Sequence, residues 1–249
     1  MSIEVKNVSV SFKDKNASIS AVNDFSCRIA ENEFIAIVGR SGCGKSTLLN
    51  VIAGYIVPNI GSVSLNESNL GEGERSSILI FQEDSVFPWM TVAENITYGL
   101  RIKKNSYEEI DAVLNKYLES TGLTKFRDFF PKDLSGGLKK RVDLARAYAI
   151  DTNIILMDEP FGSLDSHTRQ QMQELLLQLW NSKKKTIVFV THDIEEAILL
   201  ADKIIVMDKG SLIQTYISAF ERPRVNQMKY NEAFISLRRN IESKMTNEN

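Results

Sequence analysis

A glycine-rich segment of nine residues restricts the possible folds of this chain more than any other feature. Residues 39–47 read Gly-Arg-Ser-Gly-Cys-Gly-Lys-Ser-Thr and fit the pattern G-x-x-x-x-G-K-[ST]. The apolar run 34–38 precedes the segment, and Leu48, Leu49 and Ile52 follow it at helical spacing. A segment of this kind joins a buried strand to a helix, so we expect this part of the chain to fold as an α/β unit.

The same segment predicts where phosphate groups bind. Its glycines allow backbone N–H groups to converge at the positive end of the following helix, which suits the phosphates of ATP. We expect the Lys45 ammonium to reach the β- and γ-phosphates and the Ser46 hydroxyl to ligate Mg²⁺. Cys43 needs no chemical role, since a free cysteine behaves as a small apolar residue. The predicted nucleotide-binding residues of the segment are Gly39, Ser41, Gly42, Cys43, Gly44, Lys45, Ser46 and Thr47.

A pair of adjacent carboxylates follows a second apolar run. Residues 154–157 are apolar and lead directly into Asp158 and Glu159. Two carboxylates at the end of a buried strand are costly unless a cation lies beside them. We therefore expect Asp158 to hold Mg²⁺ and Glu159 to act as a general base on the attacking water. The alternative is a solvated turn that ends the strand, which the phosphate-binding segment disfavours.

Several further apolar runs predict an α/β fold with a mostly parallel sheet. Runs that are apolar throughout are typical of strands buried on both faces. Apolar residues at helical spacing lie between them, in 169–180 and 193–201. We expect a phosphate-loop (RecA-like) core together with an N-terminal antiparallel β subdomain. The predicted strands are 3–12, 34–38, 77–81, 154–157, 186–190 and 203–207.

The stretch 84–149 shows helix signals and no clear strand. Thr91 with Glu94, and Ser106 with Glu109, fit the capping box that begins a helix. We interpret 84–149 as a helical subdomain inserted into a core formed by 1–83 and 150–220. Residues 221–249 are expected to form a polar C-terminal tail with a short helix.

The charge and cysteine content exclude several classes of function. The chain has 30 basic and 32 acidic residues, a net charge of -2, so binding of nucleic acid by bulk electrostatics is not expected. Two cysteines without metal-ligand spacing favour the reducing cytosol. No secretory signal is visible at the N-terminus. No apolar run approaches the ~20 residues that cross a bilayer, so any work at a membrane would require docking to membrane partners.

Six ordered motifs resemble those of ABC ATPases, over residues 3 to about 215. Leu134-Ser-Gly-Gly137 resembles the family's signature, and residues 139–147 resemble the helix that follows it. The other matching elements are the phosphate loop, the strand-end carboxylates, Gln82 as the Q-loop glutamine, Ser163-Leu164-Asp165 as the D-loop and His192 as the switch histidine. Leu138 departs from the pattern, because the family often has Gln there, and a polar contact near the nucleotide is then missing.

The resemblance implies that ATP and Mg²⁺ are clamped between two copies of the chain. Ser135, Gly136 and Gly137 would bind the γ-phosphate of ATP held by the other copy, and Phe12 would stack on adenine. Asp165 would belong to the same nucleotide site. The implied catalytic residues are Glu159, His192, Lys45 and Gln82, and the implied metal ligands are Ser46, Gln82 and Asp158. His167 has no such match and is expected on the surface.

Residues 81–95 resemble the import ATPases for nitrate, sulfonates and taurine. That class implies a peripheral location on the cytoplasmic face of the membrane, two permease subunits and, indirectly, a solute-binding protein. Phe87, Pro88 and Trp89 are candidates for docking to the permease, although Trp89 could instead pack inside the helical subdomain. Two alternatives remain: the ATPase subunit of an exporter, or an ABC ATPase without a transport function.

Overall fold

The computed structural model describes residues 1–249 except 15–16, 67, 70–76, 151 and 247–249. The described chain divides into two compact units. Unit 1 comprises Met1–Ile78, Asn153–Glu159 and Lys185–Asn249, and unit 2 comprises Leu79–Thr152 and Pro160–Lys184. Segment 160–184 therefore groups with the helical residues 84–149, although it lies within the range 150–220 that the sequence predicts as core.

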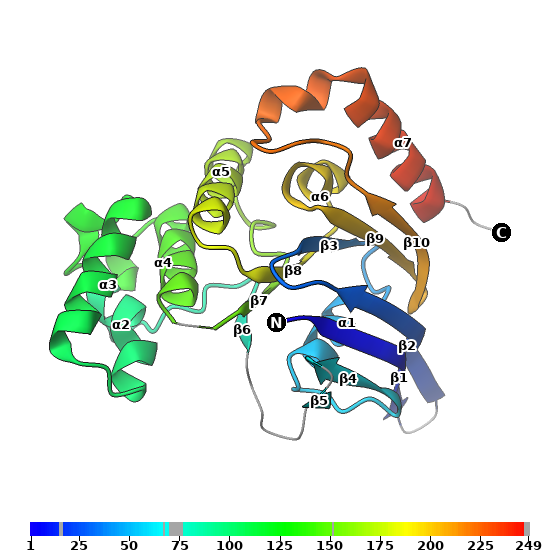
Figure 1. Ribbon diagram of the computed structural model, residues 1–249, viewed down its shortest axis with the longest axis horizontal. Coiled ribbons are helices and arrows are strands. Elements are labelled where there is room, and N and C mark those ends of the chain that lie inside the picture. The colour runs from blue at the N-terminus through cyan, green and yellow to red at the C-terminus, as the bar shows by residue number, and fades with distance from the viewer. Residues whose placement is uncertain (15–16, 67, 70–76, 151, 247–249) are drawn as a thin grey trace. The chain divides into compact units, whose positions relative to one another are not determined.

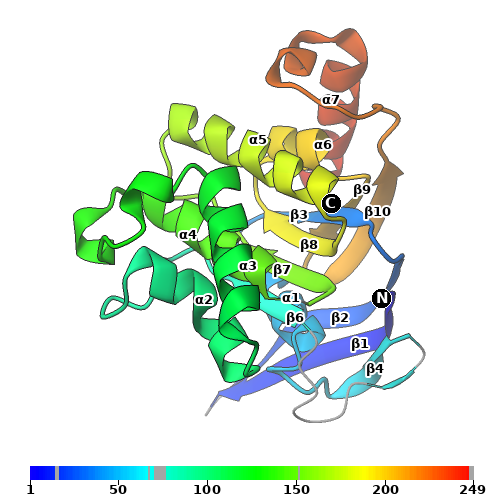
Figure 2. The ribbon, with the colours of Figure 1, turned by 60° about the vertical axis from the view of Figure 1, so that its left-hand side comes forward.

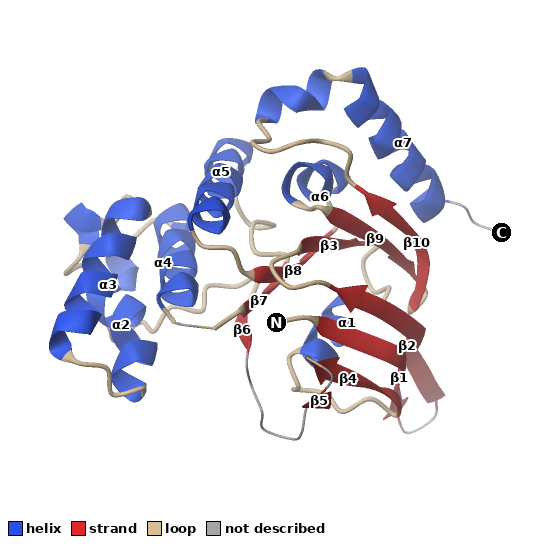
Figure 3. Ribbon diagram, viewed as in Figure 1, coloured by secondary structure: helices blue, strands red, loops and turns tan. Residues whose placement is uncertain are grey.

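The first sheet of unit 1 is antiparallel and has the strand order β2-β1-β4-β5 (Figure 3). Its strands are β1 (Ile3–Asp14), β2 (Ala17–Ile29), β4 (Ile60–Leu65) and β5 (Ser68–Asn69). In β1, Ile3 and Val5 are buried, while Glu4 and Lys6 point to the other face and form an ion pair of 2.9 Å. The predicted antiparallel β subdomain is therefore confirmed.

The second sheet is mostly parallel and has the order β10-β9-β3-β8-β7-β6, and all of its strands except the end of β6 belong to unit 1. Its strands are β3 (Phe34–Val38), β6 (Ser77–Ile80), β7 (Ile154–Asp158), β8 (Thr186–Thr191), β9 (Lys203–Asp208) and β10 (Ser211–Ile217). β3 runs parallel to β8 and β9, and β7 runs parallel to β8. Every residue of β3 and β8 is buried, as their apolar composition requires. The carboxyl ends of β3, β7 and β8 consequently meet at one edge of the sheet.

Helices cover both faces of this parallel sheet. α1 (Lys45–Ile52) contacts β7 and β8 on one face and also β2 of the antiparallel sheet, so it lies between the two sheets (Figure 1). α6 (Ile194–Leu200) contacts β3 and β8 from the opposite face. The expected α/β core with a mostly parallel sheet is confirmed.

The C-terminal region of unit 1 is more ordered than the polar tail that the sequence predicts. A 3-10 turn, η3 (Asn226–Tyr230), leads into the fifteen-residue helix α7 (Glu232–Thr246), which contacts α6 and β9. Phe234 and Ile241 are buried, and they lie two turns apart on the same face of α7. These two side chains anchor an otherwise polar helix, which explains why composition alone understates it.

Unit 2 is a group of four helices. They are α2 (Val92–Ile102), α3 (Tyr107–Ser120), α4 (Gly136–Ala149) and α5 (Ser166–Ser182), with the 3-10 turns η1 (Thr124–Phe126) and η2 (Pro131–Asp133) between α3 and α4. α2 packs against α3 and α4 (Figure 2), and α4 packs against α5. Both predicted capping boxes are present, at Thr91 and Ser106.

Candidate functional site

The glycine-rich segment lies in unit 1 between the carboxyl end of β3 and the start of α1. Gly42 and Gly44 have positive φ angles of 79° and 103°. A Cβ atom at Gly44 would collide with the carbonyl oxygen of Ala21, and one at Gly39 with that of Met207. Close packing therefore requires glycine at both Gly39 and Gly44, and the positive φ adds a conformational requirement at Gly44.

Lys45 is held inside this loop. Its Nζ donates hydrogen bonds to the carbonyl oxygens of Gly39, at 2.8 Å, and Arg40, at 3.0 Å. The same atom lies 3.9 Å from Oε1 of Glu159, and the side chain is only 5% exposed. The loop thus fixes the ammonium group between its own backbone and the carboxylate that follows β7.

Ser46 and Asp158 bring a hydroxyl and a carboxylate together from segments far apart in sequence. The Ser46 hydroxyl donates to Oδ1 of Asp158 across 3.0 Å. Burial raises the pKa of Asp158; the hydrogen bond from Ser46 opposes the rise, the charge of Glu159 adds to it, and Lys45 opposes it. A cation between these oxygens would compensate the buried carboxylate.

The oxygens of Asp158 and Ser46 fit Mg²⁺ bound together with a nucleotide. In the part of the chain that the structure describes, no group of three or more His, Cys, Asp or Glu side chains could hold a metal ion. Mg²⁺ does not need such a group, since it is commonly held by one or two protein oxygens together with substrate phosphates and waters. The donor set therefore suits a metal that arrives with phosphate.

Glu159 is fixed by its backbone and by two side chains. It has a positive φ of 44°, and its N–H donates to the carbonyl oxygen of Val190 at 2.9 Å. Nδ1 of His192 lies 2.8 Å from Oε2 of Glu159. A positive φ is uncommon for a residue with a Cβ atom, and such strain persists where surrounding contacts enforce it. The carboxylate of Glu159 is therefore held in one orientation.

The loop that carries His192 is also rigid. The Thr191 hydroxyl donates to Oε2 of Glu196 at 2.6 Å and accepts the N–H of Asp193 at 3.0 Å. Asp193 in turn caps α6 by accepting the N–H groups of Glu195 and Glu196. The His192 side chain remains 60% exposed, whereas that of Glu159 is 21% exposed. The imidazole is thus accessible but anchored at its base.

Unit 1 brings together five of the predicted catalytic and metal-binding residues, and it also contains the predicted adenine contact, Phe12. These five are Lys45, Ser46, Asp158, Glu159 and His192. Phe12 lies on β1, is 47% exposed and is opposite Ile19 of β2 in the strand register. The two side chains give this end of the antiparallel sheet an exposed apolar surface.

The remaining predicted residues lie in unit 2, where two of them cap helices. The Ser135 hydroxyl accepts the N–H of Leu138 at 3.4 Å as the N-cap of α4, whose first residues are Gly136 and Gly137. Asp165 caps α5 and accepts the N–H of Thr168 at 3.0 Å, a bond that lowers the pKa of this carboxyl group. His167 is exposed on α5, as expected.

Gln82 follows β6 with an exposed side chain, and its carbonyl oxygen accepts a hydrogen bond from Lys140 of α4. Sequence reasoning missed Lys140 and two neighbouring ionic residues, the buried Asp143 and the half-buried Arg146. The run Lys139-Lys140-Arg141 resembles an ordinary solvated helix face, so the pattern gives no sign that Lys140 is buried.

Within the described ranges, no helix combines the length and the apolarity that crossing a membrane requires. The family model for the ABC transporter matches residues 22–162, more than half of the chain. This match includes the glycine-rich segment, the signature and the carboxylate pair.

Two curated relatives and one solved cassette illustrate the similarity. The taurine import ATP-binding protein TauB of Jannaschia sp. is 37% identical over 246 residues, which cover 96% of this chain and 92% of that protein. The aliphatic sulfonates import ATP-binding protein SsuB of Bacillus cereus is 35% identical over 243 residues, which cover 97% and 94%.

The dimeric structure of MJ0796, a bacterial ABC transporter cassette, matches with a TM-score of 0.78 and 34% identity, and the match covers 88% of this chain and 100% of that one. A dimeric post-hydrolysis state of the same cassette, bound to ADP and Pi, matches with a TM-score of 0.76 and 32% identity, with the same coverage. Fold, motifs and relatives agree, and the chain belongs to the ABC transporter family as one of its ATP-hydrolysing cassettes.

Proposed function

We propose that two copies of this chain bind two molecules of Mg-ATP between them, and that hydrolysis drives the import of a small anionic solute through a membrane permease. One observation carries the chemistry of this proposal. The Glu159 carboxylate is oriented by His192 and Lys45 beside the oxygen pair of Asp158 and Ser46.

Glu159 is the proposed general base of hydrolysis. Its carboxylate accepts a proton from water while the water oxygen attacks the γ-phosphorus. The bond from that phosphorus to the β,γ-bridging oxygen breaks, and ADP leaves with the electron pair. His192 orients the carboxylate, and Lys45 balances the charge on the β- and γ-phosphates.

Ser46 and Asp158 are the proposed protein ligands of Mg²⁺. When bound, Mg²⁺ neutralises negative charge on the phosphate oxygens. We assign Gln82 a part in binding the metal and in orienting the water, because its segment resembles the family's Q-loop. The glycine-rich loop binds the phosphates through its backbone N–H groups, from Gly39 to Thr47.

The start of α4 is the proposed contact to ATP held by the partner copy. Ser135 offers an exposed hydroxyl, and Gly136 and Gly137 offer N–H groups at the positive end of a fourteen-residue helix. Charge-assisted hydrogen bonds contribute roughly 1.5–3 kcal/mol each, so several of them can make closure of the dimer depend on the γ-phosphate. Asp165 supports this surface as the cap of α5, and the exposed Phe12 side chain offers a stacking surface for adenine.

The names of similar proteins favour an importer of organic sulfonates. TauB and SsuB are both import ATP-binding proteins, for taurine and for aliphatic sulfonates. We infer that the chain lies on the cytoplasmic face of the membrane, in a complex with two permease subunits. A binding protein on the other side of the membrane would deliver the solute to these subunits.

Unit 2 has an aromatic patch, formed by the half-buried Phe87 and the exposed Trp89 and Tyr98, that suits the permease contact. The ring of Phe87 lies 5.7 Å from that of Trp89 and 4.8 Å from that of Tyr98. Trp89 is 68% exposed, which argues against a role in packing the interior of unit 2. Exposed aromatic groups of this kind are enriched at the energetic centres of protein interfaces.

Purification of the tagged chain from native membranes after cross-linking tests the proposed function. We expect two integral-membrane permease subunits to co-purify. In the reconstituted complex, a solute-binding protein loaded with taurine or an alkanesulfonate should raise ATP turnover, and the unloaded protein should not. Recovery of an exporter-type membrane partner, or of soluble partners alone, would contradict the importer.

A further inference from the structure

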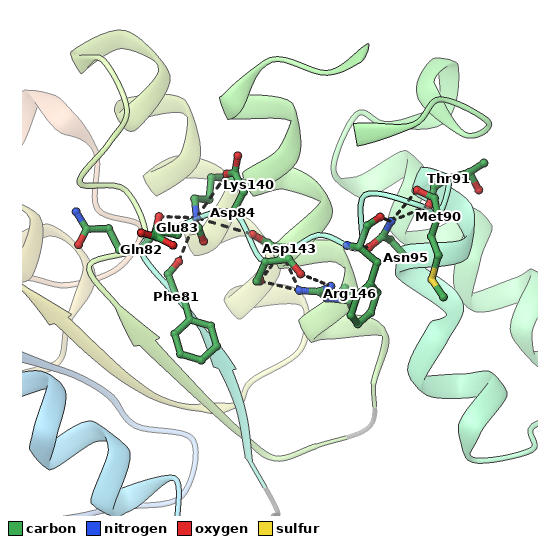
Figure 4. A network of polar contacts seen from close by, with 12 residues as sticks. Phe81, Gln82, Glu83, Asp84, Met90, Thr91, Asn95, Lys140, Asp143 and Arg146 are labelled. Atoms are coloured by element: carbon green, nitrogen blue, oxygen red, sulfur yellow. Dashed lines mark hydrogen bonds and ion pairs between the residues drawn. The ribbon is translucent and has the colours of Figure 1, made fainter. Parts of the chain in front are cut away.

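Segment 81–91 of unit 2 contains no helix or strand, yet its backbone is held along most of its length by side chains of α2 and α4 (Figure 4). Gln82 lies near the start of this segment, and Phe87 and Trp89 of the aromatic patch lie near its end. The contacts that hold the segment therefore decide how these two functional parts are arranged within unit 2.

Lys140 of α4 makes the densest set of these contacts. Its Nζ donates to the carbonyl oxygens of Phe81, at 3.1 Å, Gln82, at 2.8 Å, and Glu83, at 2.9 Å. An ammonium group has three protons, so three consecutive carbonyl groups use its whole donor capacity. Figure 4 shows the Gln82 side chain extending away from Lys140, so the lysine binds the Gln82 backbone and leaves its amide free to act elsewhere.

The Lys140 ammonium is a buried charge that the surrounding groups compensate. The side chain is 2% exposed, and burial lowers its pKa, while the carboxylates of Asp143 and Asp84 oppose this change. Nζ lies 3.8 Å from Oδ2 of Asp143 and 3.9 Å from Oδ1 of Asp84. A buried cation persists where hydrogen bonds and opposite charges compensate the loss of water, and Lys140 has both.

Further along the segment, Arg146 and Asp143 continue the network. Arg146 donates to the carbonyl oxygen of Ser85 at 2.9 Å and to its hydroxyl at 2.7 Å. Asp143, 1% exposed, accepts from the Ser85 hydroxyl and from Arg146, both at 2.9 Å. The Arg146 guanidinium also lies 5.1 Å from the centre of the Phe87 ring. The same face of α4 thus reaches from Gln82 to the aromatic patch.

Asn95 of α2 holds the end of the segment. This fully buried amide accepts the N–H of Phe87 at 2.8 Å and donates to the carbonyl oxygens of Phe87, Met90 and Thr91 at 3.0–3.2 Å. Both ends of the segment are consequently tied to helices, so unit 2 carries them as one body.

We propose that Lys140 is a positioning residue, which fixes the backbone around Gln82 by binding three consecutive carbonyl groups and thereby links Gln82 to the aromatic patch. Lys140 acts through the backbone of Gln82 and does not itself touch the nucleotide. This inference rests on the proposed role of Gln82 in hydrolysis, and its experiment includes a structural readout that does not depend on activity.

The test compares Lys140→Met with Lys139→Met. The two lysines are adjacent on α4 and both lie near Asp84. Lys139 forms an ion pair of 3.3 Å with Asp84, whereas Lys140 binds the three carbonyl groups of 81–83. Amide hydrogen exchange is measured for peptides covering 81–91, together with kcat and KM for ATP. The Lys140→Gln variant adds a graded step, because its amide keeps two of the three donors without the charge.

We expect Lys140→Met to increase amide exchange in 81–86 and to lower kcat at least about tenfold with KM for ATP within about twofold, since loss of positioning acts on turnover more than on binding. Lys139→Met should match the unchanged chain in both measurements, and Lys140→Gln should recover part of the loss. Should Lys140→Met fail to fold, Lys140→Gln is compared with Lys139→Met in the same way.

The inference would be overturned by unchanged exchange in 81–86 with kcat within about twofold in the Lys140 variants, or by equal losses in the Lys139 and Lys140 variants. A change in KM alone would also contradict it. If the unchanged chain shows no ATP turnover, the proposed function fails, whereas the exchange data still decide whether Lys140 holds the segment.

Discussion

Nδ1 of His192 lies 2.8 Å from Oε2 of Glu159, while Nζ of Lys45 lies 3.9 Å from Oε1 of the same carboxylate. Each oxygen of Glu159 therefore faces a different nitrogen. This arrangement defines the plane of the carboxylate without help from a nucleotide. It also explains how a residue with a strained backbone keeps a single orientation.

Replacing His192 with Ala should therefore lower ATP turnover by about 10- to 100-fold, because the carboxylate loses the group that orients it. Binding of ATP, measured by equilibrium titration, should remain within about threefold. The matched control is His167→Ala, which removes an exposed histidine of α5 that lies outside the proposed site. Equal turnover in the two variants would show that His192 does not orient the base.

Replacing Asp158 with Asn should make the nucleotide-free protein more stable at neutral pH and abolish Mg-dependent hydrolysis. Because burial raises the pKa of Asp158, the folded state binds its proton more tightly than the unfolded state. The carboxyl group thus lowers the free energy of unfolding progressively as the pH rises from the ordinary pKa of aspartate to the raised one. Asparagine does not titrate, so the two proteins should differ above this range and converge below it.

Urea unfolding at a series of pH values measures this difference, with the exposed Asp128→Asn as the control. Mg-ATP should then stabilise the original protein more than the Asp158 variant, since a ligand stabilises a fold in proportion to its affinity. A variant that is less stable at every pH would contradict the assignment of Asp158 as a carboxylate that is costly without a cation.

Replacing Trp89 with Ala should leave nucleotide binding intact and weaken association with the permease at least about tenfold, the loss typical of an aromatic residue at the centre of an interface. Co-purification from membranes measures the association. Tyr230→Ala is the control, because Tyr230 is 85% exposed but belongs to unit 1. Unaffected recovery of membrane partners with the Trp89 variant would remove the aromatic patch from the proposal.

The parts of the fold that depend on local sequence could be predicted. The loop at 39–47, the strand before it and the capping boxes at Thr91 and Ser106 follow from glycine conformation, apolar runs and the pairing of cap residues. β2, β4 and β10 could not be predicted in the same way. Polar residues on one face weaken the apolar pattern of all three strands, and the partner β1 of β4 is also distant in sequence.

The residues of the candidate site likewise divide into those that local sequence predicts and those that it does not. The chemistry of Lys45 and Asp158 follows from residue types beside strand ends, whereas the role of His192 came from family resemblance, since a lone histidine after a strand is usually structural. Lys140 could not be identified at all. Its burial depends on where the backbone of 81–83 lies, and that is a property of tertiary structure.

The central claim is that ATP joins two copies of the chain, and the mass of the Glu159→Gln variant in solution tests it most directly. Without its general base the variant should bind Mg-ATP but not hydrolyse it, so light scattering should give twice the mass of one chain with Mg-ATP and the mass of one chain without nucleotide. Adding Ser135→Arg to the same variant should abolish the ATP-dependent dimer, because the side chain would block the start of α4. A Glu159→Gln protein that stays monomeric at saturating Mg-ATP would contradict the account.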